Sequence, residues 1–179
     1  RPQAIRQVWR TIRHGLFPEL CTSGKIGETQ WFDSYVQTYL ERDLRTQLRV
    51  GDLREFERFL RAVAVRTGQM VNYADLARDV GIAVSTAREW VSALQSGFQV
   101  YLLEPYHRNL GKRLTKSPKL YWHDTGLAAY LLNIRTDEEA MRSPFRGALF
   151  ENWVVMELLK TLEPQTGRPA VWYWRTSNG

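Results

Sequence analysis

The segment from Tyr73 to Lys119 constrains the fold more than any other part of the chain. It begins with "YADLARDVGIAVSTAREWVSAL", in which apolar residues recur at the spacing expected of two crossing amphipathic helices. Gly81 stands between the two halves, where a glycine can adopt a left-handed backbone at no steric cost. Ser85 or Thr86 is expected to cap the second helix with a side-chain oxygen. The pattern predicts a helix-turn-helix.

Two short strands are predicted after these helices, in "FQVYLLEP" and "PKLYWHD", because both are rich in β-branched and aromatic residues. The loop between them, "YHRNLGKRLTKS", is strongly basic. A further amphipathic helix is expected before Tyr73, where Phe56, Phe59 and Leu60 follow a helical spacing. Three helices followed by a basic hairpin are typical of a winged helix, so we predict a winged helix-turn-helix over residues 51–125.

The flanking segments are predicted to be mostly helical. Residues 1–50 have the pattern of helices and connections, and Asp124 is expected to cap another helix after the hairpin. A long amphipathic helix is predicted in "SPFRGALFENWVVMELLKTL", with Ser143 and Pro144 suited to its first positions. The segment "AVWYWR" is expected to form a strand. The fold class predicted for the chain is therefore mainly α with a small β component.

Net charge, cysteine and histidine content, and the length of apolar runs limit the possible functions. A net charge of +6 favours a polyanionic partner. A single cysteine, Cys21, excludes an internal disulfide, and the three histidines lack the spacing of a zinc site. No apolar run approaches the roughly 20 residues that span a bilayer, so we expect no membrane partner and a cytoplasmic location. The chain opens without methionine and closes just after a strand-like run, and we therefore expect it to be part of a longer protein.

A DNA interface is the leading functional interpretation. The outward face at the start of a recognition helix needs small or polar residues, and the wing needs cations that can lie along phosphates. The residues predicted to make these contacts are Ser85, Thr86 and Arg88 on the helix and Arg108, Lys112, Arg113, Lys116 and Lys119 on the wing. The competing interpretation is a protein-interaction scaffold, because winged helices also bind proteins and a basic loop is often simply solvated.

Glu151 is the carboxylate most worth attention in the predicted long helix. On a helix it shares a face with Gly147, Val154, Val155 and Leu158, and an acid on a buried stripe costs free energy unless it is paired, protonated or bound to a metal. It could serve a metal site, or it could pair with an arginine such as Arg146 or Arg175. No other residues clearly complete a metal site, and no G-x-x-x-x-G-K-[ST] phosphate loop is present.

The order of motifs resembles the C-terminal region of a large family of predicted bacterial and archaeal AAA-type P-loop ATPases. The resemblance is carried by "YVQTYLERDL", "RTGQMVNYADLARDVGIAVSTAREWVSAL", "LLEPYHRNLGKRLTKSPKLYWHDTGLAAYLL", "FRGALFENWVVMELLK" and "WYWRTSNG". It implies that residues 1–50 lead from an upstream ATPase domain, that 51–125 form the winged helix, and that 126–179 begin an α/β fold similar to restriction-endonuclease (PD-(D/E)xK) domains. Glu151 then matches the helix carboxylate of that nuclease-like core.

These considerations lead us to expect a DNA-binding module that is non-catalytic as it stands. The first alternative is a metal-dependent nuclease whose remaining ligands lie in a longer chain, with Glu151 as one catalytic carboxylate. The second is a scaffold that docks on the ATPase domain. No cofactor is expected in these residues, whereas the resemblance implies ATP and magnesium for the longer protein. DNA and the ATPase domain are the expected partners, and an oligomer is compatible with the sequence.

Overall fold

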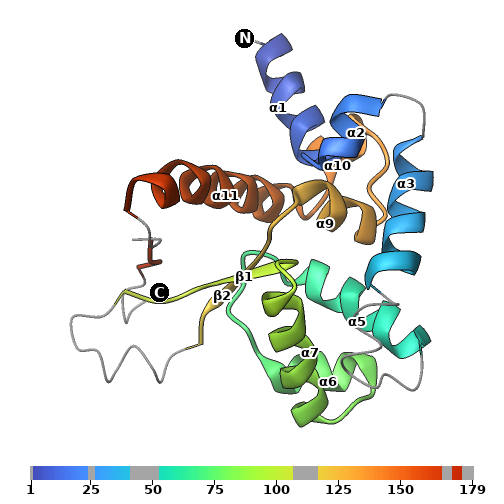
Figure 1. Ribbon diagram of the computed structural model, residues 1–179, viewed down its shortest axis with the longest axis vertical. Helices are drawn as coiled ribbons and strands as arrows, with labels where there is room; N and C mark the ends of the chain where they lie inside the picture. Colours follow the sequence, from blue (N-terminus) through green and yellow to red (C-terminus); the bar gives the residue numbers. More distant parts are fainter. Residues whose placement is uncertain (1, 24–26, 41–52, 107–116, 167–170, 175–179) are drawn as a thin grey trace.

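The computed structural model describes residues 2–23, 27–40, 53–106, 117–166 and 171–174 (Figure 1). This described part is mainly helical and contains a small two-stranded antiparallel sheet, as the sequence predicts. None of its helices combines the length and the apolar character that a membrane crossing needs. In chain order the elements are α1 (Pro2–His14), α2 (Pro18–Ser23), α3 (Glu28–Tyr35), the π-helix η1 (Val36–Leu40), α5 (Leu53–Val65), α6 (Tyr73–Val80), α7 (Val84–Ser96), β1 (Val100–Leu103), β2 (Lys119–Trp122), α9 (Thr125–Leu131), α10 (Asp137–Arg142) and α11 (Arg146–Thr166).

The turn between α6 and α7 is where the sequence predicts it. Gly81 has a φ of 89°, in the left-handed region that favours glycine. The capping prediction for the next helix was wrong. α7 already begins at Val84, and the preceding Ala83 is extended and makes no side-chain cap. Ser85 and Thr86 therefore fall within the first helical turn, where the backbone is already helical and neither residue occupies the capping position.

The hairpin is the predicted pair of strands, and β2 is bonded along both of its edges. On one edge β1 pairs antiparallel with it, with Val100 opposite Trp122. On the other edge lies the segment that joins α5 to α6. There the Gly68 amide donates to the Leu120 carbonyl at 2.7 Å, and the Leu120 amide donates to the Gln69 carbonyl at 3.0 Å. β2 is consequently the middle strand of this small assembly.

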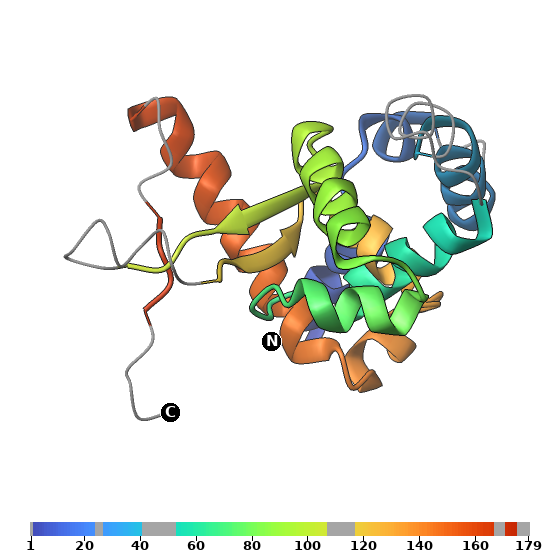
Figure 2. The ribbon, with the colours of Figure 1, turned by 90° about the horizontal axis from the view of Figure 1, so that it is seen from below.

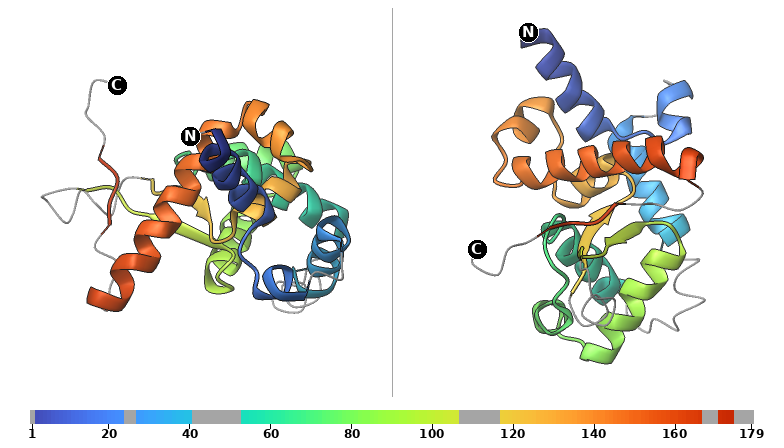
Figure 3. Two further views of the ribbon diagram at one scale, coloured as in Figure 1. Left: turned by 90° about the horizontal axis from the view of Figure 1, so that it is seen from above. Right: turned by 90° about the vertical axis from the view of Figure 1, so that its left-hand side faces the viewer.

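The larger of two apolar clusters among the described residues joins the helices around the hairpin. Trp90 of α7 meets the edges of Phe56 and Phe59 of α5, with ring centroids 5.2 and 5.1 Å apart. The same cluster of buried side chains includes Leu127 of α9 and Leu149 of α11. Figures 1 and 3 show α11 and α9 on one side of the hairpin and α5, α6 and α7 on the other. The described residues on both sides of position 125 therefore share one core.

The contact between α1 and α9 is made by the Asp124 carboxylate and by a close approach of the two backbones at Gly126. Asp124 caps α9 as predicted, since one carboxylate oxygen accepts the Leu127 amide at 2.9 Å. The other oxygen accepts the Leu16 amide at 2.7 Å, which brings the end of α1 to the start of α9. A Cβ on Gly126 would lie 2.6 Å from the His14 carbonyl, so a larger residue at this position would push the two helices apart.

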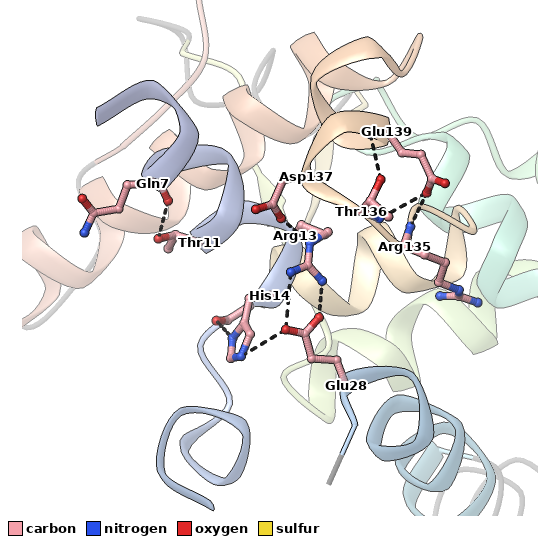
Figure 4. Close-up of polar contacts among 10 residues, drawn as sticks. Gln7, Thr11, Arg13, His14, Glu28, Arg135, Thr136, Asp137 and Glu139 are labelled. Carbon is pink, nitrogen blue, oxygen red and sulfur yellow. Dashed lines mark hydrogen bonds and ion pairs between the residues drawn. The ribbon is translucent and has the colours of Figure 1, made fainter. Parts of the chain in front are cut away.

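Arg13 ties α1 to two other helices (Figure 4). Its guanidinium forms ion pairs with Glu28 at the start of α3 and with Asp137 of α10, the second at 2.5 Å. Burial alone would lower the pKa of Arg13, but the hydrogen bonds and charges of the two carboxylates raise it above its usual value. His14 lies 3.5 Å from the same glutamate. The pairing of these charges identifies the cluster as a structural clamp.

The predicted terminal strand is represented by a single bridge. Tyr173 pairs in parallel with Pro105, which follows β1. Its amide donates to the Glu104 carbonyl at 3.1 Å, and its carbonyl accepts the Tyr106 amide at 2.8 Å. Residues 171–174 therefore meet the extension of β1 at Pro105 (Figure 2).

The side chain of Asn152 fastens α11 to β2. It is fully buried, and its amide bonds to both backbone groups of Trp122: the oxygen accepts the Trp122 amide at 2.8 Å and the nitrogen donates to the Trp122 carbonyl at 2.7 Å. The same oxygen accepts the Thr67 hydroxyl at 2.5 Å. One side chain on α11 thus occupies the place that a neighbouring strand would take at the end of β2.

Replacing Asn152 with alanine should therefore destabilise the fold by about 3 kcal/mol, because two buried backbone groups of Trp122 would lose their partners. Thr67→Val is the matched comparison, since it removes one hydrogen bond and leaves both Trp122 contacts in place, and should cost about 1 kcal/mol. Urea denaturation followed by circular dichroism would measure both values. Equal losses for the two variants would contradict this account of Asn152.

Candidate nucleic-acid interface

The start of α7 presents the residues that were predicted to meet DNA. Ser85 and Arg88 are exposed and Thr86 is half-buried, so two of the three side chains are open to a ligand. The Arg88 guanidinium lies over the ring of Tyr73 of α6, with its Cζ 4.4 Å from the ring centroid. A cation held over an aromatic face is restricted to few rotamers and keeps its charge at the surface.

A groove runs beside Arg88 between α7, the start of α6 and the segment that leads into β2. Its walls include Val84 and Arg88 from α7, Met70 and Tyr73 from the segment around the start of α6, and Ser117, which comes just before β2. Ser117 is also the first described residue after the basic loop. The structure therefore brings together the exposed face of α7 and the point at which the chain enters β2.

Four of the five predicted wing cations, Arg108, Lys112, Arg113 and Lys116, lie outside the described residues. The fifth, Lys119, is in β2. Its ammonium group is 2.8 Å from a carboxylate oxygen of Glu151 on α11. Two residues that were assigned to separate sites, a DNA contact and a nuclease carboxylate, are thus partners in one ion pair.

Glu151 has a second partner on the same strand. The Tyr121 hydroxyl donates to the oxygen that Lys119 also binds, at 2.6 Å. Partial burial by itself raises the pKa of Glu151, but the hydrogen bonds from Lys119 and Tyr121 and the lysine charge outweigh it and lower the pKa. Burial and the adjacent carboxylate raise the pKa of Tyr121. The carboxylate is therefore held in its charged form by side chains of β2.

The expected stripe on α11 is displaced by one residue. Leu158 is exposed and the Glu151 side chain retains 45% of its accessible surface, whereas Val155 is buried, so only part of this face enters the core. The buried residues of α11 are Leu149, Asn152, Val155, Met156 and Leu159. The ion pair also differs from the one considered from sequence, because the partner is a lysine rather than Arg146. Arg175 lies outside the described residues.

Asn152 is the residue that sequence reasoning missed. Its spacing from Leu149 and Met156 places it on the apolar line of α11, and an asparagine among leucines and methionine is a signal of a buried polar contact. The identity of its partner could not be inferred from that spacing. In the part of the chain that the structure describes, no group of three histidine, cysteine, aspartate or glutamate residues is placed to hold a metal ion.

Two carboxylates of α6 are already paired: Asp75, which lines the groove, and Asp79. Arg66 forms an ion pair with Asp79, and Arg78 lies 2.7 Å from Asp75. The hydrogen bond from Arg66 lowers the pKa of Asp79. These pairs reduce the repulsion that a phosphate would meet on approaching α6, because the negative charges are compensated within the helix and its neighbour.

A pocket of about 310 Å³ lies away from this interface, between the α1–α2 connection and α11. Phe17, Met156 and Leu159 contribute apolar walls, and Asp124 lies at one side. Burial raises the pKa of Asp124, although hydrogen bonds from backbone amides act in the opposite direction. Both of its oxygens already accept the amides that join α1 to α9, so this carboxylate is structural.

We expect Glu151→Gln to remove a pH-dependent part of the stability. The folded-state pKa of Glu151 is lowered, so its contribution is complete above the ordinary glutamate value and is lost as the pH falls through the folded value. The side chain is half-exposed, and the effect should therefore be below about 1 kcal/mol. Thermal melts of both proteins between about pH 7 and pH 3 should converge at the acid end.

Glu157→Gln provides the control for this experiment, because Glu157 lies on the same helix and pairs with Lys160 only one turn away. An exposed pair of this kind contributes about 0.3–0.5 kcal/mol or less. A difference between wild type and Glu151→Gln that stays constant down to the acid end would argue against the assigned ion pair.

Comparison with known proteins places this chain within a family. Residues 5–138 match the family model described as "Domain of unknown function (DUF8612)". "Uncharacterized protein Mb2031c" of Mycobacterium bovis and "Uncharacterized protein Rv2008c" of Mycobacterium tuberculosis are each 36% identical to it over 174 residues, which is 97% of this chain and 38% of the relative. The chain thus spans less than two fifths of the length of these relatives.

No solved structure matches the chain. Neither the family description nor the names of the two relatives mention an ATPase or a nuclease, so that resemblance remains a prediction. The family model, however, covers most of the chain, from α1 to the start of α10. The chain therefore belongs to the family described as Domain of unknown function (DUF8612).

Proposed function

We propose that this chain is a non-catalytic, DNA-binding winged-helix module of a longer protein. The observation that carries the proposal is the groove that Arg88, Tyr73 and Ser117 line, where Ser117 marks the entry of the chain into β2. A ligand lying there would meet the exposed start of α7 on one side and the end of the basic loop on the other. Those are the two surfaces with which a winged helix contacts a duplex.

The order and pairing of elements support a winged helix. α5 is followed by a short segment that bonds to β2, then by α6 and α7, and then by the hairpin. The bridge between Met70 and Lys119 gives this segment the role of a third, outer strand. A helix, an edge strand, two helices and a hairpin whose second strand lies in the middle make up the winged-helix arrangement.

The distribution of charge supports a polyanionic ligand. Arg88 is exposed and held over Tyr73, while Asp75 and Asp79 are compensated by arginines. The sequence between Tyr106 and Ser117 adds four arginine or lysine residues and no acidic residue. Contacts from such residues to phosphate release counterions, so binding should be strongly salt-dependent.

The longer protein would supply any chemistry. We propose, from the resemblance, that it contains an AAA-type ATPase domain that binds ATP and magnesium and that this module adjoins it. A nuclease activity would need further acidic ligands beyond Glu151, which is itself engaged by Lys119 and Tyr121. Magnesium-dependent nicking of a plasmid by the full-length protein, lost in Glu151→Ala, would favour that alternative.

Fluorescence anisotropy with a labelled duplex across a salt series tests the proposed function directly. The logarithm of the binding constant should fall linearly with the logarithm of the salt concentration, at a slope of about −0.9 for each phosphate contact. Absence of binding at low salt would refute the proposal. Docking on a protein domain would then become the better explanation of the basic loop.

Single substitutions can distinguish the contribution of α7 to DNA binding from that of the basic loop. Arg88→Ala should weaken binding roughly tenfold and relax any sequence preference, whereas Lys112→Ala and Arg113→Ala should weaken binding of all duplexes alike. Arg6→Ala is the matched control, because Arg6 is an exposed arginine of α1, at the opposite end of the molecule from α6 in Figure 1. A loss with Arg6→Ala as large as with Arg88→Ala would indicate only a nonspecific effect of net charge.

A further inference from the structure

Three large aromatic side chains form an exposed platform beyond the end of β1. Tyr106 retains 46% of its accessible surface, Trp172 40% and Trp174 73%. The rings of Tyr106 and Trp174 are stacked, with centroids 5.7 Å apart and planes inclined by 16°. Trp172 meets Tyr106 edge-on at 6.2 Å. We refer to Tyr106, Trp172 and Trp174 as the aromatic platform.

The platform is held by the structure behind it. Residues 171–174 alternate, with Val171 and Tyr173 packed against a buried cluster that includes Leu103 and Met156, and with the two tryptophans turned outward. Two backbone hydrogen bonds fix Tyr173 between Glu104 and Tyr106. In Figure 3 this short segment meets the extension of β1. The tryptophans are therefore presented on an anchored backbone.

The platform is connected to the proposed DNA groove. The Tyr173 hydroxyl donates to the Ser117 carbonyl at 2.7 Å, and Ser117 lines the groove beside Arg88. The Lys119 ammonium, which is paired with Glu151, lies 5.9 Å from the centroid of the Tyr173 ring behind the platform. A polynucleotide leaving the groove at Ser117 would come next to these aromatic side chains.

We propose that the aromatic platform binds unpaired nucleobases of single-stranded DNA that continues from a duplex held in the groove. This extends the proposed function by assigning a second ligand to the neighbouring surface. The rings of Tyr106 and Trp174 are nearly parallel, so a nucleobase can stack on the exposed face of the Trp174 indole and extend this pair to three rings. Stacking of this kind accepts every base, because each has a π face.

Charge and chemistry favour a nucleic acid over a protein at this surface. The platform consists of flat aromatic faces, and the sequence directly after Tyr106 carries Arg108, Lys112, Arg113 and Lys116. Aromatic side chains interspersed with cations are characteristic of surfaces that bind single strands. Glu104 is an exposed acid in the same segment and should oppose the approach of phosphates.

The test compares three ligands by anisotropy: a blunt duplex, the same duplex with a single-stranded tail, and the tail strand alone. The tail should tighten binding roughly tenfold, as expected for one or two stacked bases. Trp174→Ala should abolish this gain and leave blunt-duplex binding unchanged, and Trp174→Phe should retain most of it. Glu104→Gln should strengthen binding of the tailed duplex about twofold by removing one like charge.

Phe98→Ala is the matched control, because Phe98 is 77% exposed and lies in the turn before β1, away from the platform. It should bind all three ligands as wild type does. A 2-aminopurine base in the tail should lose fluorescence on binding to wild type and keep it with Trp174→Ala, which reports stacking independently of affinity.

The outcomes separate this proposal from the duplex-binding function. No advantage of the tailed over the blunt duplex would overturn the platform while leaving duplex binding intact. Trp174-dependent binding of the tail without any binding of the blunt duplex would support the platform and refute the groove. Self-association that sedimentation velocity detects in wild type and that Trp174→Ala abolishes would assign the platform to a second copy and overturn the proposal.

Discussion

The buried amide of Asn152 is the interaction on which the arrangement of this chain depends. It satisfies both backbone groups of Trp122 from a helix that is thirty residues away in sequence. These two hydrogen bonds constrain both the distance of α11 from the end of β2 and the rotation of α11 about its own axis. Glu151, the preceding residue, then reaches Lys119 and Tyr121, two residues whose side chains lie on the same face of the strand.

β2 is accordingly the element through which the other parts are positioned. Its two edges pair with β1 and with the segment before α6, and its side chains meet α11. The groove beside Arg88 and the aromatic platform both begin where the chain enters this strand. The two proposed ligand surfaces are therefore arranged around the same few residues, which explains how a single polynucleotide could engage them in succession.

Local features of the fold were predictable and long-range ones were not. The left-handed turn at Gly81, the cap at Asp124 and the two strands depend on neighbouring residues, so their patterns are visible in sequence. The prediction that Ser85 or Thr86 caps α7 was wrong, because the helix begins one residue earlier, at Val84, and the sequence pattern does not define the first helical residue that closely. For the candidate site, exposure of Arg88 was predictable, whereas its placement over Tyr73 and the pairing of Lys119 with Glu151 depend on how separate elements pack.

The pairing of β2 along both edges and from α11 also fixes the register of the hairpin. A shift by one residue would turn Tyr121 away from Glu151 and break the match between Asn152 and Trp122. The register of the hairpin therefore does not depend on the sequence between β1 and β2. Insertions, deletions or changes of charge between residues 107 and 116 should therefore leave the pairing of β2 with β1 and α11 in place.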